Sequence, residues 1–296
     1  MKNSKPLVSV VMPVRNAGNF LMSAIDSILN QTYKNLELII VDDASTDETS
    51  KILTSFKDKQ TKIFRNKKQL GVTKSANLAI TKAKGNFIAR MDADDIASPD
   101  RIAKQVDFLK KHKEVVAVGG QCEIINATGE NIGTKTFPLT DSKIKKMIFS
   151  SVPLQQPTLM VARFRLPKNF IWYDENYSSA EELELLFKLF KFGEVRNLKE
   201  CLLKYRIHKG NTSLKNPKKT FFLTLKTRFL AISKYKYRPT FGGVITTIAQ
   251  TVLISLIPDG WIYPIYSLIR GMNKLSVRIN PDANLIFKKA FELVKT

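Results

Sequence analysis

The sequence predicts an α/β fold with a mostly parallel, Rossmann-like sheet and helices on both of its faces. Short β-branched runs alternate with segments of helical periodicity through the first half of the chain, and the turns between them are short. A chain of 296 residues with 44% apolar content can also bury the core that such a sheet needs. In sheets of this class, ligands collect outside the carboxyl ends of the strands.

The predicted elements follow one another in a regular order. Apolar runs predict strands over 7–12, 36–41, 62–65, 86–91 and 115–118. Apolar residues at helical spacing predict helices after Gly18, Ser45, Gly71 and Pro99, and Ser45 with Glu48 has the pattern of a capping box. The second half is less regular, with a strand expected over 158–161 and a helix over 179–190 that carries acids in its first turn.

An acidic loop follows the fourth predicted strand. Asp92, Asp94 and Asp95 lie within four positions of a chain whose formal net charge is +22. Three ionised carboxylates repel one another, so a cation or several hydrogen-bond donors must hold them together. Oxygen ligands favour Mn²⁺ or Mg²⁺ over zinc, and such ions keep coordination positions that a diphosphate can occupy. The loop therefore indicates nucleotide-diphosphate chemistry.

Two alternatives to such a metal site differ in how well the loop fits them. A calcium-binding EF-hand needs Gly at its sixth position and Glu at its twelfth, where this loop has Ala97 and Ala103. A capped turn is the second alternative, because Ser98 and Pro99 are a good helix start that the loop acids could cap. No GxGxxG or GxxxxGK[ST] motif follows a predicted strand, which argues against a dinucleotide oxidoreductase or a P-loop nucleotidase.

Positive charge is concentrated in the last third of the sequence. Residues 201–258 contain no Asp or Glu but eleven basic residues, which are Lys204, Arg206, Lys209, Lys215, Lys218, Lys219, Lys226, Arg228, Lys234, Lys236 and Arg238. Such a segment should bind an anionic surface, either nucleic acid or acidic lipid headgroups.

An apolar segment continues from this basic segment. Between residues 241 and 269 the only formally charged residue is Asp259, and Pro258 interrupts the apolar run before it reaches the ~20 residues that a bilayer crossing needs. Aromatic residues follow at 261–266, of a type that lies at headgroup depth. Together these features predict a basic and apolar helical extension that lies in the membrane plane. The alternative is a helical pair that packs on the core or on another subunit.

Two further features bear on location. Cys122 and Cys201 do not make a disulfide framework, which fits a reducing cytosolic setting. The apolar run from Leu7 to Val14 is too short for a signal peptide. The sequence therefore predicts a cytoplasmic protein that is peripheral on the inner face of the cell membrane.

Several motifs resemble those of the inverting family 2 glycosyltransferases, which have the GT-A fold. The matching segments are residues 8–16, 31–33, 37–47, 77–79 and 91–95, and the likeness covers about residues 6–213. The resemblance implies a GT-A domain over 1–213, with a nucleotide-sugar-binding half over 1–120 and an acceptor half over 121–213. The basic and apolar extension would then occupy 214–296.

The resemblance also implies roles for residues in the first half. Pro13, Arg15 and Asp42, with Asp43 nearby, would hold the base and ribose of a nucleotide-diphospho-sugar. The acidic loop resembles the family's DXD motif. Asp92 and Asp94 would then face the ribose and diphosphate, and Asp94 and Asp95 would bind Mn²⁺ or Mg²⁺.

Residues of the second half match the family less completely. Glu182 stands at the position of the catalytic base, and Glu181 beside it is the other candidate. Arg206 and His208, followed by Ser213, resemble a closing motif whose basic residues lie near the departing diphosphate. For Arg206 and His208 a surface charge and an ordinary loop histidine are the alternatives.

The function implied by the resemblance is a metal-dependent, inverting transfer of a sugar to the hydroxyl of a saccharide or lipid-linked acceptor. Cell-envelope polysaccharide, lipopolysaccharide or glycolipid synthesis would suit a membrane-bound enzyme. A nucleotidyltransferase and a nucleic-acid-binding protein that stacks bases on residues 234–238 are competing hypotheses. No nucleic-acid partner is expected, because the acidic loop would repel phosphodiesters. The C-terminal helices could also join copies of the chain.

Overall fold

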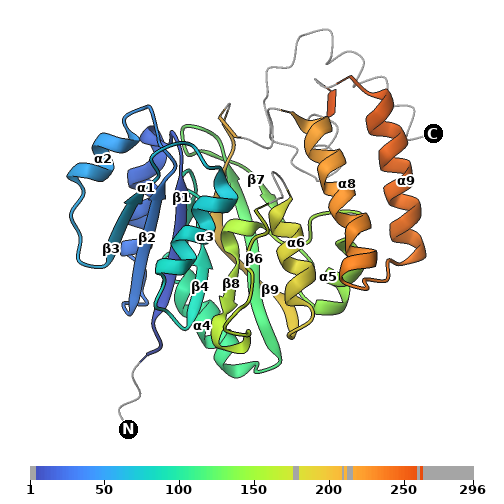
Figure 1. Ribbon diagram of the computed structural model, residues 1–296, viewed down its shortest axis with the longest axis horizontal. Coiled ribbons are helices and arrows are strands. Elements are labelled where there is room, and N and C mark those ends of the chain that lie inside the picture. Colours follow the sequence, from blue (N-terminus) through green and yellow to red (C-terminus); the bar gives the residue numbers. More distant parts are fainter. Residues whose placement is uncertain (1–4, 176–179, 209, 212–215, 259–260, 263–296) are drawn as a thin grey trace.

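The computed structural model describes residues 5–175, 180–208, 210–211, 216–258 and 261–262 (Figure 1). Within these ranges the strands form one nine-stranded sheet of order β3-β2-β1-β4-β8-β6-β9-β5, and β7 pairs with β6. The strands are β1 (Val8–Val14), β2 (Leu36–Asp42), β3 (Thr61–Arg65), β4 (Phe87–Arg90), β5 (Ile96–Ala97), β6 (Val115–Ile125), β7 (Asn131–Lys135), β8 (Met160–Ala162) and β9 (Glu194–Arg206). All five strands predicted in the first half are present.

Helices cover both faces of the sheet, as predicted. They are α1 (Gly18–Leu29), α2 (Thr49–Ser55), α3 (Val72–Lys82), α4 (Arg101–Lys111), α5 (Asp141–Met147), α6 (Glu181–Leu189), α8 (Pro217–Lys234) and α9 (Phe241–Leu256), with 3-10 turns η1 (Gln156–Thr158) and η2 (Arg163–Arg165). One apolar core joins α1, α2 and α4 to the sheet, and a second joins α3, α5 and α6 to the opposite face. In β1, for example, Val10 and Met12 belong to the first core and Val11 to the second, as strand alternation requires.

The expectation of a mostly parallel sheet was wrong. β3, β2, β1 and β4 are parallel, as are β6 and β9, but β8 runs antiparallel to both β4 and β6. β5 and β7 also pair in antiparallel fashion with β9 and β6. Parallel neighbours need a crossover connection, usually a helix. β7 follows β6 after a short turn and therefore pairs with it in the antiparallel direction. β5 follows β4 after a short turn but pairs with β9, which lies far along the chain. The sheet is therefore mixed.

Two helix starts differ from the predictions. The helix predicted from a capping box at Ser45 begins at Thr49, because the Ser45 hydroxyl accepts a hydrogen bond from the Asn16 backbone N–H instead (3.0 Å). The helix predicted from Pro99 begins at Arg101, with Asp100 at the N-cap position. The acids of the loop thus do not cap α4, and the capped-turn alternative for the loop was wrong.

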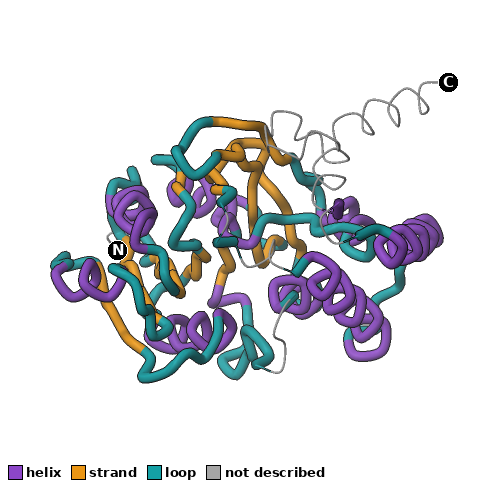
Figure 2. The backbone as a smooth tube through the Cα atoms, turned by 90° about the horizontal axis from the view of Figure 1, so that it is seen from above, coloured by secondary structure: helices purple, strands orange, loops and turns teal. Residues whose placement is uncertain are grey.

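α8 and α9 lie side by side next to α5 and α6, on the side of the molecule away from β1, β2 and β3 (Figures 1 and 2). α8 buries Thr227, Arg228 and Ala231, and Nε of Arg228 donates to the carbonyl of Ile148 (3.2 Å). α9 buries only Gly243 and Thr247 among its described residues, and the Thr247 hydroxyl donates to the Phe149 carbonyl (2.8 Å). The predicted aromatic segment beyond residue 262 and Ser213 lie outside the described residues.

Among the described residues, none of the helices combines the length and the apolar character that a membrane crossing requires.

Candidate active site

The carboxyl ends of three parallel strands meet at one edge of the sheet. Val14 of β1 is paired with Asp42 of β2, and β4 ends at Arg90 beside Val11 of β1. These strand ends and the turns that follow them carry most of the predicted site residues. The structure therefore brings the first-half candidates to the same edge, as the general rule for such sheets predicts.

The turn after β1 is joined to the turn after β2 by hydrogen bonds. Pro13 is buried within β1, whereas the Arg15 side chain is exposed and donates from Nη1 to the carbonyls of Asp43 (2.6 Å) and Ala44 (3.0 Å). Asn16 has φ 50°, a left-handed conformation that asparagine tolerates, and its Oδ1 accepts from the Thr46 backbone N–H (2.9 Å). Arg15 therefore lies at the surface of this sheet edge, and the two carbonyls hold its guanidinium in place.

Asp42 and Asp43 are both buried but have different partners. Oδ1 of Asp42 accepts from the Ser45 backbone N–H (2.9 Å), and Arg65 lies 3.5 Å from its Oδ2. The Asp43 carboxylate accepts from the backbone N–H groups of Leu70 (2.7 Å) and Gly71 (2.8 Å) and from the side-chain amide of Asn66 (2.8 Å). Burial alone would raise the pKa of Asp43, but these donors together lower it. Asp43 thus holds the loop that precedes α3.

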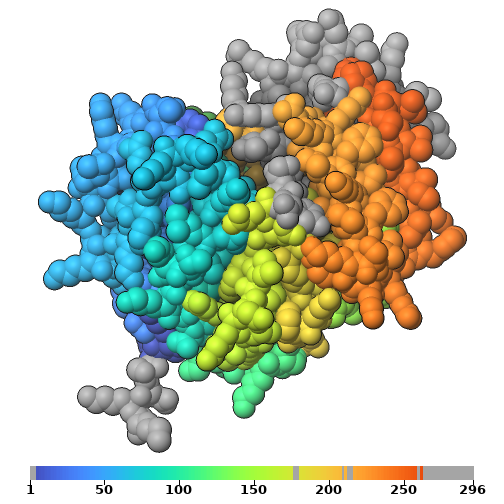
Figure 3. All heavy atoms as spheres, viewed as in Figure 1, coloured from blue at the N-terminus to red at the C-terminus, as the bar shows by residue number. Residues whose placement is uncertain are grey.

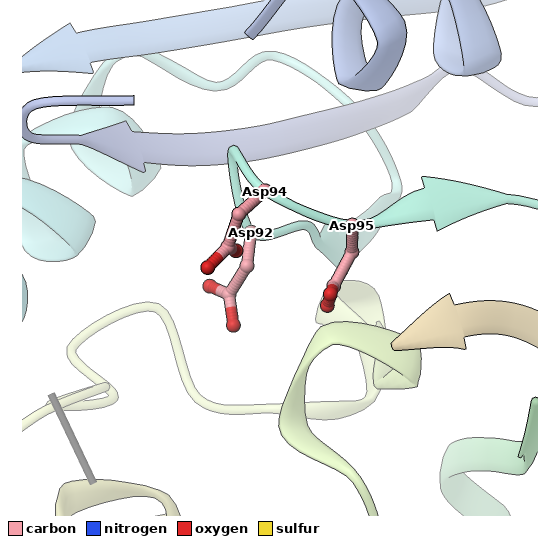
Figure 4. A group of neighbouring side chains, drawn as sticks. All are labelled: Asp92, Asp94 and Asp95. Carbon is pink, nitrogen blue, oxygen red and sulfur yellow. The ribbon is translucent and has the colours of Figure 1, made fainter. Parts of the chain in front are cut away.

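The acidic loop brings its three carboxylates together. One oxygen of each of Asp92, Asp94 and Asp95 lies within 4.8 Å of the others, and all three side chains extend to the same side of the loop (Figure 4). Asp92 and Asp94 are partly exposed, whereas Asp95 is fully buried. The outer pair can therefore reach a ligand, and Asp95 lies behind it.

Two buried arginines, which no sequence pattern indicated, lie under this loop. Nη2 of Arg90 is 2.7 Å from Oδ1 of Asp92, and Arg90 is 3% exposed. Arg101, which has no exposed surface, donates from Nη2 to the Arg90 carbonyl (2.7 Å) and from Nε to Oε1 of Gln105 (3.1 Å). Buried charges need such partners, so the arginines and the acids stabilise one another. A single basic residue at the end of the otherwise apolar strand β4 is the signal that could have indicated Arg90.

The turn after β9 closes the site from the second half of the chain. Nε2 of His208 lies 2.9 Å from Oδ2 of Asp94, and the imidazole packs on the ring of Phe20 at 4.7 Å between centroids. The side-chain amide of Asn211, which no sequence pattern indicated either, lies 3.3 Å from the same Asp94 oxygen. His208 therefore contacts the acidic loop directly, and its role in binding a nucleotide-sugar stays a prediction.

Arg206 is buried next to His208 and supports the loop from below. Its backbone N–H donates to Oδ1 of Asp95 (2.8 Å), and its Nε donates to the Asp94 carbonyl (2.8 Å). Nη1 donates to the carbonyls of Asn126 and Ala127, and the guanidinium lies over Phe20 at 4.7 Å. Arg206 is 4% exposed, so the surface-charge alternative was wrong. In this structure Arg206 positions the acidic loop.

Glu181 and Glu182 lie at the start of α6, where Ala180 has a left-handed φ of 62°. Glu181 is buried and Glu182 is half-buried. Burial, with the neighbouring Glu181 and then Asp92 adding negative charge, raises the pKa of Glu182 to about 8. The pKa of Glu181 is also raised by burial, against the effect of Arg90. The carboxyl groups of Glu181 and Glu182 therefore interact electrostatically with Asp92.

The donor set of the acidic loop fits a hard divalent cation. Burial and the charges of Asp94 and Asp92 raise the pKa of Asp95 well above its usual range, and burial raises that of Asp92 despite Arg90. Within the described residues, Oδ2 of Asp95 is buried without a hydrogen-bond partner. Clustered carboxylate oxygens with an unpaired buried acceptor suit Mg²⁺ or Mn²⁺. The metal roles of Asp94 and Asp95 stay predictions.

The chain is similar in sequence to a family of known proteins. The family model described as glycosyl transferase family 2 matches residues 9–169. An uncharacterized glycosyltransferase of Haemophilus influenzae is 34% identical over 218 residues, which are 70% of this chain and 68% of that protein. An uncharacterized glycosyltransferase of Rickettsia prowazekii is 33% identical over 215 residues, covering 70% of this chain and 66% of its own length.

Solved structures share the fold. Residues 1–349 of S. aureus TarS, crystallised with UDP-GlcNAc, superpose with a TM-score of 0.61 at 20% identity, covering 76% of this chain and 66% of that one. The same part of TarS crystallised with UDP gives a TM-score of 0.59 and covers 65% of that chain. The α/β fold is thus GT-A-like, as the sequence resemblance implied. Because the family model spans more than half of the chain and relatives above 30% identity carry the same activity in their names, the chain belongs to glycosyl transferase family 2 and is a glycosyltransferase.

Proposed function

We propose that this glycosyltransferase moves a sugar from a nucleotide-diphospho-sugar to an acceptor hydroxyl by one metal-dependent, inverting displacement. The observation that carries the proposal is the cluster of Asp92, Asp94 and Asp95 together with Glu182, whose raised pKa reflects burial and the charges of Glu181 and Asp92. The UDP-GlcNAc complex of TarS supports a nucleotide-sugar donor for a chain of this fold. With the family established, a nucleotidyltransferase or a nucleic-acid-binding protein has no support left.

The aspartate cluster and Glu182 would have different tasks. Asp94 and Asp95 would hold Mn²⁺ or Mg²⁺, which supplies a Lewis acid that neutralises charge on the departing diphosphate, worth several kcal/mol. Arg15, Asp42 and Asp92 would orient the base, ribose and diphosphate. His208, held against Asp94, can donate a hydrogen bond at the same place.

Glu182 would act as the general base. It removes the proton of the acceptor hydroxyl while that oxygen attacks the anomeric carbon from the side opposite the diphosphate, so that the anomeric configuration inverts. Its partial exposure leaves the carboxylate accessible, whereas Glu181 is more buried and would set the charge around it. The raised pKa places proton transfer near neutral pH.

The acceptor would be a saccharide or a lipid-linked sugar at an anionic membrane surface, on the inner face of the cell membrane. Support comes from α9, where large apolar side chains recur on one helical face and are all more than half exposed. They are Phe241 (82%), Ile245 (51%), Ile248 (58%), Val252 (56%) and Leu256 (78%). α8 and α9 form one side of the molecule in the space-filling view (Figure 3). Such a stripe beside a basic segment is typical of in-plane membrane helices. Envelope polysaccharide, lipopolysaccharide or glycolipid synthesis would use such an enzyme.

A screen of nucleotide-sugars tests the chemistry. The enzyme would be incubated with each donor, beginning with UDP-GlcNAc, and with detergent-solubilised lipid acceptors in the presence of Mn²⁺, Mg²⁺ or a chelator. We expect release of nucleoside diphosphate that requires the metal and is lost in Asp94→Asn. Release that is unchanged by the chelator would overturn the metal-dependent mechanism. An α-linked product from an α-linked donor would overturn inversion.

A further inference from the structure

A hollow of about 480 Å³ lies outside the candidate active site, where α5 and α6 meet the connection between α8 and α9. Its lining includes five basic residues, which are Lys145, Lys146, Lys191, Lys236 and Arg238. In the part of the chain that the structure describes, none of the lining residues is acidic. A concave site lined by one sign of charge concentrates ions of the opposite sign.

The walls of this basic hollow are held in place by aromatic side chains. Phe187 of α6 is stacked with Tyr235 (6 degrees between ring planes) and packs edge-on against Tyr237. The Tyr237 hydroxyl donates to the Lys145 carbonyl (2.6 Å), and the Tyr235 hydroxyl donates to the buried carboxylate of Glu184. These bonds join α5, α6 and the α8–α9 connection. The hollow is therefore built from three elements and does not depend on one side chain.

The five cations differ in how far they are already neutralised. Lys145 pairs with Asp141 (2.7 Å) and lies over the Phe190 ring, and Lys191 lies over the Tyr235 ring (5.1 Å). Among the residues that the structure describes, Lys146, Lys236 and Arg238 have no carboxylate within ion-pair distance. Three exposed, unneutralised charges around an aromatic-walled hollow suit a phosphate group, which accepts several charge-assisted hydrogen bonds.

The apolar stripe of α9 begins beside this hollow. Arg238 and Thr240 line the hollow, and Phe241, the first residue of the stripe, follows Thr240 directly. A ligand with a phosphate in the hollow and hydrocarbon along α9 would satisfy both surfaces. We infer that the basic hollow binds the phosphate headgroup of an anionic lipid, with the acyl chains against α9. This inference rests on the proposed membrane association and names the lipid contact that fixes the enzyme's orientation.

The test compares two charge-matched variants of the full chain. The first is Lys146→Gln, Lys236→Asn and Arg238→Gln; asparagine is chosen at 236 because Lys236 has φ 55°. The control is Lys57→Gln, Lys59→Gln and Lys67→Gln, which removes the same charge from exposed lysines around α2 and β3, on the opposite side of the molecule (Figure 1). Calorimetry measures binding of short-chain phosphatidylglycerol, glycerol phosphate and inorganic phosphate, and co-sedimentation measures binding to phosphatidylcholine vesicles with or without phosphatidylglycerol.

We expect wild type and control to bind short-chain phosphatidylglycerol alike and the hollow variant to bind at least about tenfold more weakly, as the loss of several surface charges near a phosphate implies. Equal weakening in both triple variants would show a general charge effect and overturn the inference. Equal affinity of wild type for inorganic phosphate and for the lipid would overturn the lipid in favour of a soluble phosphate.

Nucleoside diphosphate binding with Mn²⁺ serves as the separate readout for the acidic loop. It should be the same in both triple variants, because neither set touches that loop. If this binding is absent in wild type while the lipid binds, the donor proposal fails and the lipid site stands. If all vesicle binding is absent while nucleotide binds, the membrane association fails and the lipid inference fails with it.

Discussion

At the scale of single residues, Glu182 and Glu181 provide the sharpest test of the reaction. Glu182→Gln keeps the size of the side chain but removes its ability to accept a proton, so we expect kcat to fall about 10²–10⁴-fold with little change in donor affinity. Glu181→Gln should lower kcat less, because Glu181 is buried beside the base. Steady-state kinetics with the identified donor provides both values. A larger loss in Glu181→Gln would reverse the two assignments.

The raised pKa of Glu182 predicts the pH dependence of the reaction. A base with a pKa of about 8 is mostly protonated at lower pH, so kcat/KM should rise with pH through about 8. Glu181, Asp92 and Arg90 act on the same group, so the measured value belongs to the set of groups. Because the folded pKa lies above the ordinary 4.5, this group also makes the free energy of unfolding fall as pH rises between those values. A flat profile across this range would contradict the assignment.

The hydrogen bonds of Asp43 lead to a prediction about the free energy of unfolding, which is separate from catalysis. Asp43→Asn turns one acceptor oxygen into an NH₂ group that faces either the N–H groups of Leu70 and Asn66 or that of Gly71, and we expect a loss of about 1–3 kcal/mol in the free energy of unfolding. The pKa of this carboxyl is lowered in the fold, so its contribution is present above the unfolded pKa and is lost as pH falls through the folded value. Urea denaturation measures the change. Exposed Asp26 of α1 offers a control through Asp26→Asn, which should leave the free energy of unfolding almost unchanged.

Among the elements, the sequence predicted strands β1 to β4 better than the rest. β1, β2 and β4 are buried on both faces and appear in the sequence as continuous apolar runs between turn signals. β5 has two residues and β8 has three, which is too short for a periodic pattern. β5 pairs with β9, which lies far along the chain beyond α6, and β8 lies between β4 and β6. Local spacing holds no information about such partners.

The difference between local patterns and distant contacts also explains why the sequence indicated some candidate site residues and not others. The acids stood out because like charges clustered in a basic chain, and His208 because of its motif. Arg90 is a single charge in an apolar strand, and Arg101 is one of several charges in an amphipathic helix. Their role follows only from the folded distances to Asp92 and to the Arg90 carbonyl. Asn211 has no sequence signal at all. Residues of other elements that neutralise a charged loop can be identified only from the folded structure.

At the scale of the whole molecule, the outer face of α9 predicts binding to membranes. Ile248→Asn replaces a side chain that is 58% exposed, so stability should change little, while affinity for anionic vesicles should fall about ten- to a hundredfold. Ile171, 70% exposed and outside the two C-terminal helices, is the matched control through Ile171→Asn. Vesicle co-sedimentation measures both. If Ile248→Asn instead abolishes self-association without affecting vesicles, the stripe joins copies of the chain.

The hydrogen bond between Asp94 and His208 joins residues that are 114 positions apart. A ribosome releases the acidic loop well before it has made β9, which is the only strand that β5 pairs with among the described residues and which leads directly to His208. During that interval the nascent loop has its repelling charges but lacks the imidazole and the Arg206 backbone that hold them. The contacts that hold Asp94 and Asp95 are therefore completed late in synthesis, and a protein cut short before β9 would lack them.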